Sequence, residues 1–171
     1  MLRLLALVTL LGFAAPAFAD PETGAAHTTI AIQPIMLVAA FVDASVEHQV
    51  APHVGVVAIG GLGFPITGAT LYELGAQGNV YLFHAFRGVH LGTEVKYLWG
   101  SSHFGLLGGP QASSFVTERV LGAYVGYKWI AAHQITAELQ VGVGRLELSG
   151  TTTTAMTEII PVANLAAGWS F

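Results

Sequence analysis

The 171-residue sequence contains no cysteine, and only 9% of its residues are charged. Without cysteine the chain can form neither a disulfide framework nor a thiolate metal site. Its formal net charge of −4 provides no basic surface for nucleic acid. These deficits exclude disulfide-stabilised mini-proteins and nucleic-acid-binding proteins as classes.

Beyond residue 19 the sequence also lacks an uninterrupted apolar run of about 20 residues, the length that a membrane-spanning helix needs. The best candidate, 30–42, carries Gln33 and Pro34. Yet 53% of the chain is hydrophobic, a composition typical of membrane proteins. Because only a closed β-barrel satisfies every backbone hydrogen bond in a bilayer without helices, the sequence predicts a barrel.

The first 19 residues predict export. Arg3 precedes an apolar run over 4–13, and a small-residue pattern ends at Ala19, which is the layout of a cleaved secretory signal peptide. An uncleaved membrane anchor is the alternative, but Pro16 interrupts it. We therefore expect a signal peptide over 1–19, a short N-terminal segment over 20–27 and a barrel domain over 28–171.

Alternation of polar and apolar side chains marks the strands. In YELGAQGNVYL the even positions are apolar or small, whereas Glu73, Gln77 and Asn79 occupy odd positions. The segments GVHLGTEVKYLWG, HQITAELQVGVG and VDASVEHQV divide in the same way. A period of two is typical of strands with one lipid-facing and one lumen-facing side. We predict strands near 28–38, 41–50, 53–64, 70–82, 88–99, 115–129, 134–147 and 157–171.

These strands predict an all-β fold, an eight-stranded antiparallel up-and-down transmembrane β-barrel, with the even strand number expected of bacterial barrels. With Phe171 at the periplasmic edge, the turns at 51–52, 83–87 and 131–133 are periplasmic. The longer connections at 100–114 and 148–156, rich in Gly, Ser and Thr, are external. The first hairpin is the weakest element, because Pro34 interrupts its first strand. A single kinked strand there would leave seven strands.

Aromatic side chains of a membrane barrel gather in two belts at the two interfaces. The predicted belts comprise Tyr72, Tyr97 and Trp99 on the outer side and Tyr127, Trp129, Trp169 and Phe171 on the periplasmic side.

The C-terminal alternation ANLAAGWSF resembles the C-terminal signature of bacterial outer-membrane β-barrel proteins. More widely, IAIQPIMLVAAFVDASVEHQV, YELGAQGNVYLFHAFRGVHLGTEVKYLWG and LGAYVGYKW resemble a family of small bacterial outer-membrane barrels. That family shares its architecture with the membrane domain of the outer-membrane protein A group. The resemblance implies an eight-stranded barrel in the outer membrane of a Gram-negative bacterium, whose terminal Phe171 is read by the barrel-assembly machinery. It assigns no reaction, because fold alone does not imply function.

Strand parity directs a set of polar side chains into the barrel: Glu47, Glu73, Gln77, Asn79, His90, Glu94, Lys96, Glu138 and Gln140. The interior of an eight-stranded barrel is just wide enough for side chains or one small ligand. We therefore expect a filled lumen in which the charges are paired. The alternative is a cation or proton pathway along the glutamates.

Candidate catalytic and metal residues are sparse. Lipid-deacylating barrels carry a His and a Ser close together on a late strand, whereas 157–171 contains no His. His103 with Ser101 and Ser102 falls in a predicted loop, and His84 lacks companion ligands at zinc spacing. We predict no catalytic residue, cofactor or metal.

Arg119 and Arg145 carry the one surface hypothesis. Parity places both on the lipid-facing side near the outer ends of their strands, where guanidinium groups can meet lipopolysaccharide phosphates. The alternative is ordinary snorkelling of the two side chains.

Together these observations predict a monomeric, non-enzymatic outer-membrane barrel with a structural or adhesive role through its external loops. One alternative is a narrow passage for small or hydrophobic solutes with a lateral exit, which a kink at Pro34 or Pro161 would favour. The others are a lipid-modifying barrel enzyme and a soluble periplasmic binding barrel, whose apolar parity would face inward.

Overall fold

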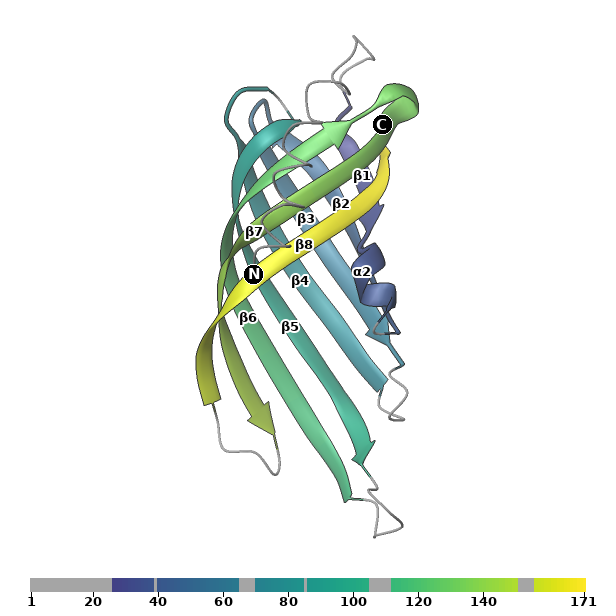
Figure 1. Cartoon of the computed structure of the whole chain (residues 1–171), viewed down its shortest axis with the longest axis vertical. Helices are drawn as coiled ribbons and strands as arrows, with labels where there is room; N and C mark the ends of the chain where they lie inside the picture. The colour runs from purple at the N-terminus through teal and green to yellow at the C-terminus, as the bar shows by residue number, and fades with distance from the viewer. Residues whose placement is uncertain (1–25, 39, 65–69, 85, 105–111, 151–155) are drawn as a thin grey trace, which may run out of the picture.

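A computed structural model describes residues 26–38, 40–64, 70–84, 86–104, 112–150 and 156–171; the predicted signal peptide lies outside these residues. Eight antiparallel strands pair in chain order, and the first pairs with the last to close a barrel (Figure 1). The predicted eight-stranded up-and-down architecture is therefore confirmed. The strands are β1 (Thr28–Ile32), β2 (Phe41–Ala51), β3 (Val54–Gly63), β4 (Thr70–Tyr81), β5 (Gly88–Phe104), β6 (Ala112–Ile130), β7 (Ile135–Gly150) and β8 (Met156–Ser170).

Side chains along each strand alternate between the two faces of the barrel wall. On β4, Tyr72 and Leu74 are exposed, whereas Glu73 and Gln77 are buried. Strand β4 thus turns apolar residues outward and polar residues inward, opposite to a strand of a soluble barrel, whose apolar parity faces the core. On β3 the buried residues include the apolar Val57 and Ile59. Among the described residues no helix combines the length and the apolar character needed to cross a membrane.

The first strand is shorter than predicted. β1 ends at Ile32 instead of residue 38, and Pro34 begins the four-residue helix α2 (Pro34–Leu37). Proline has no N–H and its fixed φ suits the first turn of a helix, so the ladder stops there. β1 and β2 nevertheless remain separate strands, so the seven-strand alternative is wrong.

The two longest connections are shorter than predicted. β5 continues to Phe104 and β6 begins at Ala112, with Phe104 paired to Ala112. Likewise β7 reaches Gly150 and β8 begins at Met156. The small and hydroxyl side chains in these segments predicted loops. Strand pairing continues through them because backbone hydrogen bonds between strands form whatever the side chain. Residues 105–111 and 151–155 lie outside the described part of the chain.

The two ends of the barrel differ. Phe171 and the short connections after β2, β4 and β6 lie at one end, called here the C-terminal end (Figure 1). The third of these connections contains the short helix η2 (Ala132–Gln134). The connections at 105–111 and 151–155 join strands at the opposite, far end. This is the asymmetry expected of short periplasmic turns and long external loops.

Candidate functional site

The lumen of the barrel is the candidate site. The structure buries all of the polar side chains that parity directs inward, and none exposes more than 9% of its surface. Most of them belong to two clusters and one hydrogen-bonded chain. These nine residues are Glu47, Glu73, Gln77, Asn79, His90, Glu94, Lys96, Glu138 and Gln140.

Glu47 is the centre of the cluster nearest the C-terminal end. Its carboxylate accepts hydrogen bonds from Lys128 Nζ at 2.5 Å, Asn79 Nδ2 at 2.8 Å and the Tyr81 hydroxyl at 2.9 Å. We call Glu47, Asn79, Tyr81 and Lys128 the Glu47 cluster. The absence of a side chain at Gly55 makes room for it, because a Cβ there would meet the Glu47 carboxylate. The cluster pairs its two charges and ties β2, β4 and β6 together.

Lys128 and Phe86 are lumen residues absent from the predicted set. Lys128 is 1% exposed, and its Nζ lies 3.7 Å from the centre of the Phe86 ring, within cation–π range. Phe86 lies in the turn after β4 and adopts a positive φ of 62°, so a strained turn inserts its ring among buried side chains. Alternation in the segment YKW predicts that Lys128 points inward, between two outward aromatic residues. Nothing periodic in the turn signals Phe86.

His90, Glu138, Gln140 and Asn164 form a chain across β5, β7 and β8, called here the His90 chain. His90 Nε2 lies 3.1 Å from Glu138 Oε1. Gln140 Nε2 donates to the same oxygen at 2.5 Å, and Asn164 Nδ2 donates to Gln140 Oε1 at 3.1 Å. The chain therefore links the centre of the lumen to the wall at β8.

The cluster toward the far end is rich in acids. Lys96 Nζ lies 3.6 Å from Glu73 Oε1, 3.7 Å from Asp43 Oδ2 and 3.8 Å from Glu94 Oε2. These separations are too long for direct hydrogen bonds, and within the described part of the chain those carboxylate oxygens have no hydrogen-bond partner. We call these four residues the Lys96 cluster. One cation faces three acids in this part of the lumen.

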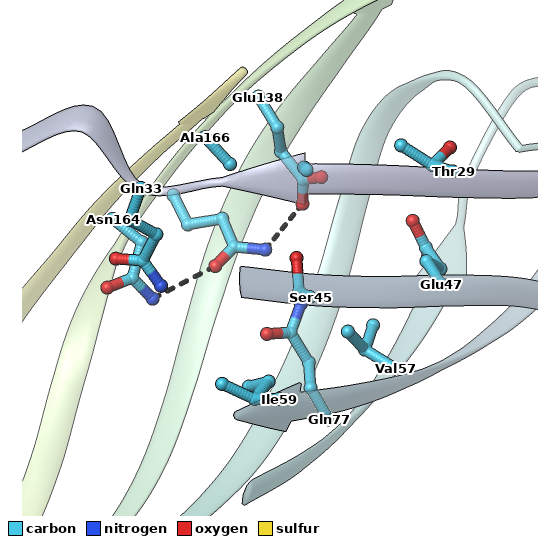
Figure 2. A pocket seen from close by; sticks show the side chains of 12 residues that line it. Thr29, Gln33, Ser45, Glu47, Val57, Ile59, Gln77, Glu138, Asn164 and Ala166 are labelled. Carbon is cyan, nitrogen blue, oxygen red and sulfur yellow. Dashed lines mark hydrogen bonds between the residues drawn. The ribbon is translucent and has the colours of Figure 1, made fainter. Parts of the chain in front are cut away.

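A small cavity lies within the lumen (Figure 2). Its volume is about 30 Å³, enough for about two water molecules. The cavity is lined by residues of the Glu47 cluster, residues of the His90 chain and other inward-facing residues of the barrel. The lining residues are Thr29, Ala31, Gln33, Ser45, Glu47, Val57, Ile59, Gln77, Glu138, Gln140, Asn164 and Ala166.

Two observations concern metal binding and nucleophilic serine within the described residues. In the described ranges no group of three or more acidic or histidine side chains is arranged to hold a metal ion. Ser170 of β8 is buried and bonds to the hydroxyls of Thr29 and Thr136 instead of to a histidine. A nucleophilic serine needs a neighbouring general base.

Outside the barrel, Arg119 and Arg145 lie on neighbouring strands toward the far end, and each side chain is more than half exposed. Glu147 lies between them: Arg145 Nη2 is 2.9 Å from Glu147 Oε1, and Arg119 Nη1 is 3.9 Å from Glu147 Oε2. The sequence analysis missed Glu147, which shares their outward parity. The three side chains form a cationic surface patch, called here the Arg119 patch.

The aromatic residues proposed for the two belts lie at opposite ends of the strands. Near the far end Trp99 stacks on Tyr72 with ring centres 5.8 Å apart and lies 5.5 Å from Tyr97. At the C-terminal end Tyr127 and Trp129 lie 4.6 Å apart. Trp169 and Phe171, also at this end, are about half exposed.

The structure is similar to the crystal structure of the N-terminal β-barrel domain of Pseudomonas aeruginosa OprF. The match covers 87% of this chain and 100% of that one, with a TM-score of 0.50 and 14% sequence identity. The likeness establishes the fold. It confirms the predicted eight-stranded barrel and extends to no activity. No protein-family model and no curated protein matches the sequence.

Proposed function

We propose that this chain is an integral outer-membrane barrel of a Gram-negative bacterium, exported by a signal peptide over 1–19. It acts without catalysis, as a monomer, in a structural or adhesive role through its external loops. The single observation that carries this proposal is the lumen, whose part nearest the C-terminal end is occupied by paired and hydrogen-bonded side chains. A filled eight-stranded barrel leaves its surface and loops as the parts available to partners.

The proposed partners follow from the position of the barrel in the outer membrane. The outward apolar side chains face membrane lipid, and the Arg119 patch faces the phosphates of lipopolysaccharide. The C-terminal strand, ending in Trp169 and Phe171, is the segment offered to the barrel-assembly machinery during insertion. The similarity to the OprF barrel domain supports the membrane placement.

A planar-bilayer measurement tests the filled lumen. We expect the refolded mature protein to show no discrete conductance steps, and Glu94→Gln to stay equally silent. Heat-modifiable gel mobility establishes that each barrel is folded. Cation-selective openings that weaken in Glu94→Gln would overturn the proposal in favour of a narrow passage. The same protein with 105–111 and 151–155 exchanged for Gly-Ser segments tests the loops, since its expression should no longer promote cell attachment.

The Arg119 patch predicts recognition of phosphate. Arg119→Gln with Arg145→Gln should bind bisphosphorylated lipid A about tenfold more weakly, a loss of about 1.4 kcal/mol. Glu147→Gln should bind it more tightly, because both guanidinium groups are then free to meet phosphate. Native mass spectrometry of the refolded barrel measures both effects.

Arg87→Gln is the matched control, because Arg87 is exposed at the C-terminal end of the barrel. Equal binding of dephosphorylated lipid A by all variants is also expected. If the double variant binds bisphosphorylated lipid A as strongly as the parent protein does, the two arginines only snorkel.

A further inference from the structure

The barrel wall is incomplete beside β8. A strand needs about 9–11 residues to cross a bilayer, whereas β1 has five and spans about 17 Å. β1 pairs with β8 only from Ala167 to Ser170. Toward the far end, residues 156–166 of β8 pair with β7 on one side and, among the described residues, with no strand on the other. We call this gap between β8 and α2 the seam.

Pro34 explains why the ladder stops. Thr28 and Phe171 exchange both backbone hydrogen bonds, at 2.8 and 2.9 Å. In an antiparallel ladder such pairs recur at every second residue, so Ile30–Trp169 and Ile32–Ala167 follow in register. The next pair would join Pro34 to Leu165. Proline has no N–H to donate, so the bond to the Leu165 carbonyl cannot form.

Pro161 removes a second donor from the same edge. Residue 161 has the parity of Phe171, so its backbone nitrogen points toward the seam and away from β7. Its pairing with Val143 of β7 is therefore undisturbed. A proline within an exposed edge prevents another strand from adding to it. Neither residues 34–38 nor a strand of a second copy can complete a ladder here.

Helix α2 borders the seam. It contacts both β2 and β8 beside the open edge (Figure 1). None of its four residues is buried, and Ile35 is 59% exposed. This outward surface is apolar, with Leu37 and Val38 exposed next to Ile35. Lipid chains can therefore lie against it.

The lumen cavity lies directly behind the seam. Gln33, at the end of β1, and Asn164 and Ala166 of β8 line its wall (Figure 2). Glu47 and Glu138 also line it, and both are already paired, to Lys128 and His90. Ser45 and Gln33 contribute a hydroxyl and an amide. The cavity therefore suits a small hydrogen-bonding group without net charge.

We propose that the seam is a lateral opening for a single-chain amphiphile of the membrane. The amphiphile places a small hydroxyl head group in the cavity and lays its apolar chain along α2. A hydroxyl supplies the donor that the Leu165 carbonyl lacks and also accepts from an amide such as Gln33. A peptide strand is disfavoured as occupant by the two prolines. The inference goes beyond the loop-based function and rests on the proposed membrane placement alone.

Photo-crosslinking tests the proposal. The refolded mature protein in phosphatidylcholine vesicles receives hexadecanol carrying a diazirine next to the hydroxyl carbon. After irradiation, peptide mass spectrometry locates the adducts. We expect them to concentrate on 31–38 and 157–166, at least fivefold above the rest of the apolar belt. A diazirine hexadecane without the hydroxyl should label the whole belt evenly.

Pro34→Ala with Pro161→Ala restores both donors and should extend the β1–β8 ladder, reducing adducts at the seam about fivefold. Pro52→Ala, in the exposed turn after β2, is the matched control and should label like the parent protein. Even labelling of the belt by the alcohol would overturn the lateral opening while leaving membrane placement intact. Absence of adducts with both reagents would overturn the placement itself. If the double variant does not fold, comparison of the two reagents on the parent protein decides.

Discussion

Replacing Glu47 by glutamine should lower the free energy of unfolding by about 3–5 kcal/mol. Lys128 is fully buried, and its ammonium group bonds to the Glu47 carboxylate at 2.5 Å. The substitution keeps the shape of the side chain but leaves that ammonium without a negative partner. A buried charge without its counter-charge is far more costly than a missing surface pair.

Urea unfolding of the protein refolded into lipid vesicles, followed by tryptophan fluorescence, measures the change. Glu158→Gln is the control, because Glu158 is exposed on β8 and should change stability by less than about 1 kcal/mol. Adding Lys128→Met to Glu47→Gln should recover a large part of the loss, since both charges are then gone. If Glu47→Gln were as stable as Glu158→Gln, the Glu47 cluster would contribute nothing to the stability of the fold.

Gly92→Ala should cost about 3 kcal/mol, although alanine is the smallest possible addition. Tyr124 of β6 lies directly opposite Gly92 in the register, and its ring occupies the space that a Cβ would fill. The Tyr124 hydroxyl donates to Asn79 Oδ1 at 2.6 Å. A displaced ring would break that bond and leave buried polar groups unpaired.

Gly78→Ala is the matched control for Gly92→Ala. Gly78 lies on the neighbouring strand β4, and a Cβ there meets no atom within 4 Å. This substitution should leave stability unchanged or raise it slightly, because alanine is less flexible than glycine in the unfolded chain. The same vesicle-unfolding measurement compares the two variants. Similar effects at both positions would mean that the ring of Tyr124 moves aside without cost.

The two charged clusters of the lumen differ in how well their polar groups are paired. The Glu47 cluster pairs its charges and bonds, whereas the Lys96 cluster surrounds one ammonium with three carboxylates at 3.6–3.8 Å. The C-terminal half of the lumen is therefore the better-satisfied half.

Strand parity alone is enough to predict which side of the barrel wall a residue faces. Alternation in YELGAQGNVYL places Glu73 and Gln77 inside and Tyr72 outside, because successive side chains of a strand always point to opposite faces. The same rule placed Arg119 and Arg145 on the outer surface and would have revealed Lys128. The number of strands followed from counting these segments, and it is correct.

Which inward residues contact one another depends on how the strands are paired in space. Glu47 and Lys128 are 81 positions apart, and their contact depends on the register of all the intervening strands and on closure of the barrel. Closure also set the seam. It fixed a register in which Pro34 would be the next residue to pair, with Leu165, and it turned Pro161 toward the same edge. Parity is a property of one strand, whereas register is a relation between strands that turns and closure fix together.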